Sequence, residues 1–85
     1  MSATEKATLV NLIRTVDREN LLRDHSNDRG PEIREARRQL WSQIVPAFND
    51  ICGTNCGLKK LTNVLHRVKT NPKSDAYSIL YEEDV

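Results

Sequence analysis

The chain of 85 residues has the length of one domain, with 38% hydrophobic and 29% charged residues. Its three glycines and three prolines are too few for the closely spaced turns of a β-sandwich or barrel, and its apolar runs are too short to span a membrane. The net charge of +1 hides an asymmetry, because nine basic and three acidic side chains lie in residues 29–73, whereas residues 74–85 carry four acidic and no basic ones. A polyanion would therefore bind the middle of the chain.

The first element is predicted to be a helix over residues 3–18. Ser2 and Glu5 have the spacing of a capping box, and apolar residues recur at helical spacing after them. Leu21 and Leu22 are expected to pack against the core near a short turn. Residues 24–30 have the composition of a polar loop.

The second and strongest periodic signal predicts a helix over residues 31–52. Pro31 suits the first helical position, and Gly53 suits the end. Pro46 removes one backbone hydrogen bond and predicts a bend on the solvent side, with a break into two helices as the alternative. The residues that trace one face of this helix are Ile33, Ala36, Arg37, Leu40, Trp41, Ile44, Val45, Phe48 and Ile51.

A third helix is predicted over residues 56–70, with Thr54 or Asn55 as its cap and Pro72 after its end. Residues 71–85 are expected to form an acidic, flexible tail, although a short linear motif or a fourth helical turn docked on the bundle are alternatives. The inward positions of the third helix are Leu58, Leu61, Leu65 and Val68. The predicted fold is thus an all-α three-helix bundle.

The outward face of the third helix has the composition of a surface that contacts DNA in the major groove. Lysine and arginine neutralise phosphates, while asparagine and histidine can hydrogen-bond to base edges. The alternative is an ordinary solvated face. The stripe comprises Lys59, Asn63, His66 and Thr70, and it is flanked by Lys60, Arg67 and Lys69.

Two arginines at the start of the second helix are further candidates for phosphate contacts. Arg34 and Arg38 are one helical turn apart and share a face. Pairing of Glu35 with Arg38 within the helix is the competing interpretation.

The sequence predicts neither a metal site nor an enzyme, and no cofactor is expected. Cys52 and Cys56 lack the C-x-x-C pairs that are usual in structural zinc sites, and we expect reduced thiols in an intracellular protein, with Cys52 filling core space. The carboxylates at Asp17, Glu19, Asp24 and Asp28 are scattered in a polar region, and we interpret them as helix-end and loop charges, because a general acid or base would need burial to tune its pKa.

Several of these features occur together in one family. The sequence resembles the Myb/SANT-like DNA-binding domains, especially the MADF branch, over residues 5–70. The resemblance is carried by Leu12-Ile13-x-x-Val16, Leu22-x-Asp24-His25, Trp41-x-x-Ile44-x-x-x-Phe48-Asn49 and Lys59-Lys60-Leu61-x-Asn63-x-x-x-Arg67.

The resemblance implies a tri-helical, helix-turn-helix-like domain over residues 1–70 whose third helix contacts DNA. It places Lys59, Lys60, Asn63, His66 and Arg67 in the contact stretch and Trp41, Ile44 and Phe48 in the core, where Leu61 and Leu65 are also expected. Family members are mostly nuclear transcription regulators or chromatin-associated proteins, and some bind proteins instead. We therefore expect a nuclear DNA-binding domain that uses duplex DNA as its partner, with a protein-interaction module of the same fold as the alternative.

Overall fold

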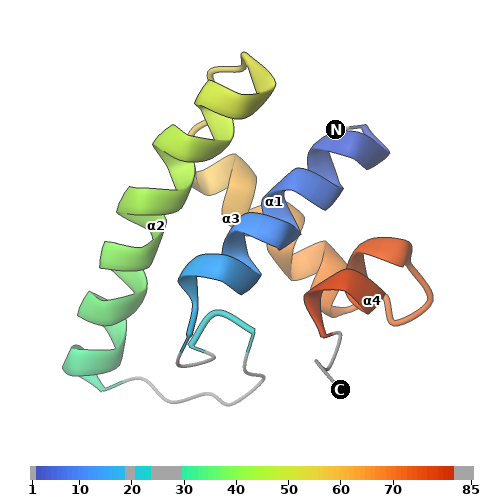
Figure 1. The fold of residues 1–85 in the computed structure, drawn as a ribbon. Coiled ribbons are helices and arrows are strands. Elements are labelled where there is room, and N and C mark those ends of the chain that lie inside the picture. The colour runs from blue at the N-terminus through green and yellow to red at the C-terminus, as the bar shows by residue number, and fades with distance from the viewer. Residues whose placement is uncertain (1, 19–20, 24–29, 82–85) are drawn as a thin grey trace.

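The computed structural model describes residues 2–18, 21–23 and 30–81. They form four helices: α1 (Ala3–Val16), α2 (Pro31–Cys52), α3 (Leu58–Lys69) and α4 (Asp75–Leu80) (Figure 1). No strand occurs in these three stretches, and the predicted all-α class is confirmed. The predicted count of three helices is wrong, because α4 lies in the segment expected to be a flexible tail.

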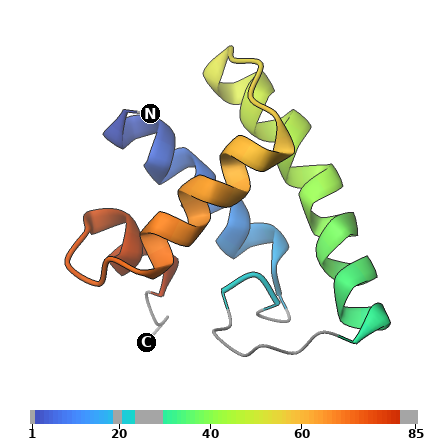
Figure 2. The same cartoon turned by 180° about the vertical axis from the view of Figure 1, so that it is seen from behind.

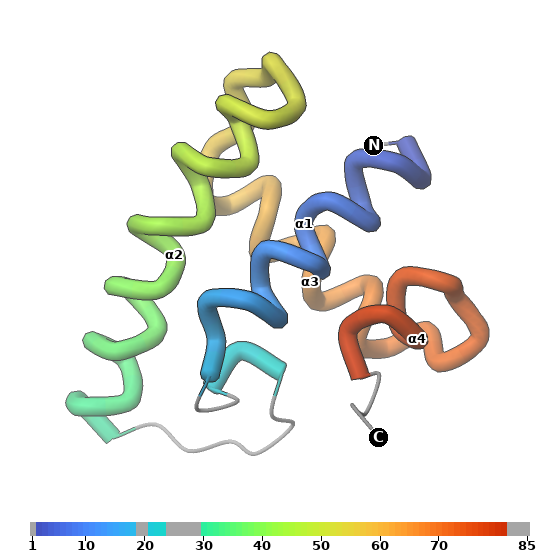
Figure 3. The backbone as a smooth tube through the Cα atoms, in the orientation of Figure 1, coloured from blue at the N-terminus to red at the C-terminus, as the bar shows by residue number. Residues whose placement is uncertain are grey.

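The helices are arranged around α1. In Figure 1, α1 lies between α2 and α4, and α3 crosses behind it; the reverse view in Figure 2 shows α3 in front. α1 packs against all three other helices. The tube in Figure 3 shows that the start of α2 extends well away from α3 and α4. No helix in the described part of the chain has the length and apolar character needed to cross a membrane.

The predicted capping box at the start of α1 is present. The Ser2 amide donates to Glu5 Oε1, and the Glu5 amide donates to Ser2 Oγ, both over 3.2 Å. The helix ends at Val16, two residues earlier than predicted. Asp17 leaves the helical conformation there, with φ −84° and ψ 70°.

α2 has the predicted bounds because local signals fix both of its ends. Pro31 occupies the first turn, where its missing N–H costs nothing, and Gly53 adopts φ 63°, a left-handed conformation that favours glycine. Pro46 is exposed inside one uninterrupted helix, so the alternative of two separate helices is excluded.

The α2–α3 connection differs from its prediction. Neither Thr54 nor Asn55 caps α3, whose N-cap is Gly57. The side chain of Asn49 holds the connection extended instead. Its Oδ1 accepts from the Cys56 amide at 2.8 Å and from Thr54 Oγ1 at 3.0 Å, and its Nδ2 donates to the Cys56 carbonyl at 2.9 Å. These hydrogen bonds hold residues 54–56 outside the helix, and α3 therefore begins only at Leu58.

The hydrophobic core draws on all four helices and on Leu22. Trp41, Ile44 and Phe48 of α2 are buried, as are Leu61 and Leu65 of α3. Two residues expected to face inward are exposed instead, Ile51 by 61% and Leu58 by 47%. Both lie beside the α2–α3 connection, Ile51 near the end of α2 and Leu58 at the first position of α3. The remaining core residues are Leu9, Val10, Ile13, Leu22, Val64, Val68, Ala76 and Leu80.

A short turn at residues 21–23 is held by a buried carboxylate. Asp17 is fully buried, and its carboxylate accepts from the amides of Leu21 at 2.7 Å, Leu22 at 2.8 Å and Arg23 at 3.2 Å. The Arg23 guanidinium donates to the Asp17 carbonyl at 2.8 Å. These bonds compensate for the removal of the charged group from water.

The three carbonyls of the same turn accept hydrogen bonds from three other parts of the fold. Arg37 of α2 donates from Nε to the carbonyl of residue 21 at 3.2 Å. Lys69 of α3 donates to that of residue 22 at 3.0 Å, and the Tyr81 hydroxyl, just after α4, donates to that of residue 23 at 2.6 Å. The 21–23 turn thus joins α2, α3 and the end of α4.

Candidate nucleic-acid interface

One face of α3 is polar and exposed, because the opposite face is used for the core. Leu61, Val64, Leu65 and Val68 are buried at helical spacing, which leaves the intervening positions to solvent. We call the exposed row the α3 stripe; it comprises Lys59, Asn63, His66 and Thr70. The structure therefore leaves this row accessible, as the sequence pattern predicts.

The three basic residues that flank the α3 stripe are not equivalent. Lys60 and Arg67 are exposed. Lys69 is half-buried, and its ammonium donates to the carbonyl of Leu22. The geometry therefore does not support the expected contact of Lys69 with phosphate, because its ammonium group is bound to the backbone of residue 22.

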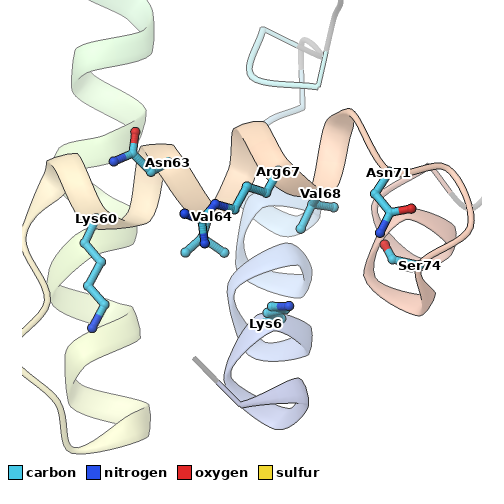
Figure 4. A pocket seen from close by; sticks show the side chains of 8 residues that line it. All are labelled: Lys6, Lys60, Asn63, Val64, Arg67, Val68, Asn71 and Ser74. Carbon is cyan, nitrogen blue, oxygen red and sulfur yellow. The ribbon is translucent and has the colours of Figure 1, made fainter.

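A polar hollow of about 550 Å³ lies along the side of α3 that faces α1. Figure 4 shows Lys60 and Arg67 extending from α3 and Lys6 lying below them on α1, with Asn71 and Ser74 side by side at one end. Asn63 leaves the opposite edge of α3 and thus borders both the hollow and the α3 stripe. The lining of this α1–α3 hollow comprises Lys6, Lys60, Asn63, Val64, Arg67, Val68, Asn71 and Ser74.

The lining of the hollow has the chemistry of an anion site. It contains three cations, two amides and a hydroxyl, but no carboxylate and no aromatic ring. Ser74 Oγ accepts from the amide of Tyr77 at 3.0 Å, so its hydroxyl hydrogen can still donate to a ligand. Lys60, Asn63 and Arg67 belong to the predicted site, whereas the sequence pattern did not predict Lys6, Asn71 and Ser74.

Glu5 directly precedes Lys6 in the chain but does not line the hollow. The Ser2 backbone amide and then the Ser2 side chain lower the pKa of Glu5, and the positive charge of Lys60 lowers this pKa further. Glu5 is therefore an ionised neighbour of the hollow, and its charge opposes the binding of an anion there.

The two arginines of α2 lie differently relative to α3. Arg34 belongs to the start of α2, which extends away from α3 (Figure 1). Arg38 lines a shallow groove together with Leu58, the first residue of α3, but its guanidinium also lies 3.9 Å from Glu35. The structure therefore does not bring Arg34 to the α3 stripe, and it shows the intrahelical pair of Arg38.

The shallow groove beside Arg38 is mainly apolar. It has a volume of about 340 Å³ and runs between the middle of α2 and the start of α3. The exposed part of Leu58 forms one wall. The other lining residues are Arg38, Trp41, Ser42, Val45 and Pro46.

The two cysteines are thiols in partly buried positions, and Cys52 packs against the core as expected. Within the described ranges, no group of three histidine, cysteine, aspartate or glutamate residues is placed to hold a metal ion. His25, Glu19, Asp24 and Asp28 lie outside these ranges.

The chain matches no protein-family model, no curated protein and no solved structure. Its function has to be argued from the fold and from the α3 stripe and the α1–α3 hollow.

Proposed function

We propose that this chain is a DNA-binding domain of a nuclear transcription regulator or chromatin-associated protein, with α3 lying in the major groove. The observation that carries the proposal is the exposure of the α3 stripe and of its cationic flanks. Lys59, Asn63 and His66 would face the bases, and Lys60 and Arg67 would contact phosphates. A Myb/SANT-like arrangement of the MADF type is part of the proposal, with α4 as an addition to it.

The arrangement of charge supports the proposal further. α3 has no acidic residue in its first turn and carries the exposed cations Lys59, Lys60 and Arg67 within twelve residues. An α-helix fits the width of the major groove, and cations along it replace the counterions of the DNA backbone. Burial of the other face of α3 fixes the helix to a rigid core, so that its polar side chains are presented in a defined orientation.

The test is fluorescence anisotropy with a random-sequence DNA duplex between 50 and 200 mM salt. We expect the wild-type affinity to fall steeply with salt, and the double variant Lys60→Ala/Arg67→Ala to bind more weakly, with a salt slope smaller by about 1.8. The charge-matched control is Arg18→Ala/Arg34→Ala, which removes two exposed cations away from α3. Equal losses in both variants, or no binding by folded wild-type protein at 50 mM salt, would contradict the proposal.

A protein-interaction module of the same fold is the second candidate. The observation that favours it is the apolar groove between α2 and α3, where Leu58 is 47% exposed. In this case we expect a partner to co-purify after nuclease treatment and to be lost in Leu58→Glu but retained in Lys59→Ala. Loss of the partner upon nuclease treatment would favour DNA binding instead.

A further inference from the structure

The α1–α3 hollow differs from the α3 stripe in position and in chemistry. The stripe is a row along one helix, whereas the hollow is concave and combines residues from α1, α3 and the segment before α4. Lys6 lies far from α3 in the sequence and has no part in the proposal made for the stripe. A cation from a second helix at the same concavity suggests that the hollow makes a contact of its own, separate from those of the stripe.

The lining restricts the ligand to an anionic group. Lys6, Lys60 and Arg67 supply three positive charges, and Asn71 and Ser74 supply neutral donors. The hollow lacks an aromatic side chain on which an unpaired base could stack, which is the usual device of single-strand binding. These features favour a phosphate group over a base, and the backbone of a duplex over a single strand.

The position of Asn63 links the hollow to the α3 stripe. Because Asn63 borders both surfaces, a ligand in the hollow would lie immediately beside one in contact with the stripe. In a duplex, backbone phosphates flank the major groove on both sides, so a helix in the groove has phosphates next to it.

We propose that the α1–α3 hollow binds a phosphodiester of the same duplex whose major groove receives α3, a proposal that rests on the proposed function. Lys6 holds this phosphate from α1, while Lys60 and Arg67 hold it from α3. The contact would fix the orientation of the domain on DNA, because one strand is gripped by two helices. Glu5, the residue before Lys6, carries a negative charge that opposes this contact.

The experiment compares Lys6→Ala with Arg18→Ala in the anisotropy titration described above. Each variant removes one exposed cation, from the first turns of α1 and from just beyond its end, and circular dichroism checks that both remain folded. We expect the salt slope to fall by about 0.9 for Lys6→Ala and to stay unchanged for Arg18→Ala. We also expect the side-chain amide resonance of Asn71 to shift when the duplex is added.

A second variant is expected to strengthen the same contact instead of weakening it. Glu5→Gln removes the negative charge beside Lys6 in the chain, while glutamine still serves as the third residue of a capping box. We expect it to bind the duplex more tightly than the wild type.

The failures of the two proposals are distinguishable. If the wild type binds DNA with a steep salt slope but Lys6→Ala matches it, the phosphate site in the hollow is wrong and the proposed function stands. Equal losses in Lys6→Ala and Arg18→Ala would likewise overturn the site, because general charge would then explain both. If the folded wild type binds no duplex, both proposals fail.

Discussion

Asp17 is the single residue on which the connection after α1 depends most. Its carboxylate is fully buried and satisfies the amides of Leu21, Leu22 and Arg23. Hydrogen bonds to a charged group contribute more than neutral ones, and a buried donor without an acceptor costs its full desolvation energy. A side chain of this kind affects the stability of the fold and not the chemistry of a ligand site.

We therefore expect Asp17→Asn to lower the free energy of unfolding by about 2–4 kcal/mol, because its amide nitrogen cannot accept a bond from the turn. Urea denaturation at pH 7 measures the change. The control is Asp50→Asn on the exposed face of α2, which should change stability by less than about 0.5 kcal/mol. Similar effects of the two substitutions would contradict the role given to Asp17.

Glu5 makes the start of α1 sensitive to pH. The Ser2 backbone amide lowers the pKa of Glu5 below its ordinary value of 4.5, and the Ser2 hydroxyl adds to the effect. Because the folded pKa lies below the unfolded one, the carboxylate stabilises the fold above about pH 4.5, and this contribution is lost as the pH falls through the folded pKa.

Carboxyl-detected NMR titration of Glu5 should thus give a pKa below 4.5 in the wild type. We expect Ser2→Ala to move this pKa upward, because it removes the hydroxyl and loosens the capping box. Thr4→Ala, which leaves both capping hydrogen bonds in place, should not move it. A pKa that is the same in Ser2→Ala and the wild type would refute this origin of the shift.

At the scale of the helices, α4 acts as a part of the core. It has only six residues, too few to form a stable helix alone, so packing must stabilise it. Ala76 and Leu80 supply that packing, and Leu80 is fully buried. The side chain of Ser74 caps the first turn.

Leu80→Ala should consequently destabilise the whole domain by about 2–4 kcal/mol, the usual cost of removing a buried leucine side chain. Thermal or urea unfolding followed by circular dichroism measures it. Ser78→Ala, at an exposed position of the same helix, should have little effect. If both variants were as stable as the wild type, α4 would not contribute to the core.

The helices also show which parts of the fold could be predicted from the sequence. The ends of α2 could be predicted to the residue because Pro31 and Gly53 act locally. α4 could not, because its apolar residues form a helix only through packing on distant parts of the chain. The same holds for the start of α3, which is set by hydrogen bonds of Asn49 to the connection before it.

Of the candidate site, the α3 stripe could be predicted from the sequence, whereas the α1–α3 hollow could not. Periodicity alone placed Lys59, Asn63 and His66 on an exposed face, since the apolar positions of α3 leave that face to solvent. The hollow was not predictable, because its concave shape and Lys6 depend on how α1 crosses α3.

At the scale of the whole molecule, Lys69 differs from the other basic residues of α3, because it stabilises the fold and is not part of the proposed DNA contact. Lys69 belongs to the same helix as the α3 stripe, yet its ammonium donates to the carbonyl of Leu22, 47 residues away in sequence. No local pattern could reveal this partner. The basic residues of α3 therefore divide into those that face solvent and one that joins α3 to the 21–23 turn.

We expect Lys69→Met to lower the free energy of unfolding by about 1–2 kcal/mol, because a charge-assisted hydrogen bond is lost, and to leave the salt slope of DNA binding unchanged. Denaturation and anisotropy on the same samples measure both effects. Lys73→Met, at an exposed position after α3, controls for the loss of a lysine charge. A smaller salt slope in Lys69→Met alone would return this residue to the DNA interface.

The hydrogen bond from Tyr81 to the carbonyl of Arg23 spans 58 residues and has a consequence for synthesis. A ribosome makes the chain from its N-terminus, so α1, α2 and α3 emerge before the residues that complete the core around α1. Because Leu80 and Tyr81 come last among the described contacts, the native packing can close only after the residues up to 81 have left the exit tunnel. Until then, the apolar surface of α1 that α4 covers stays open to chaperones.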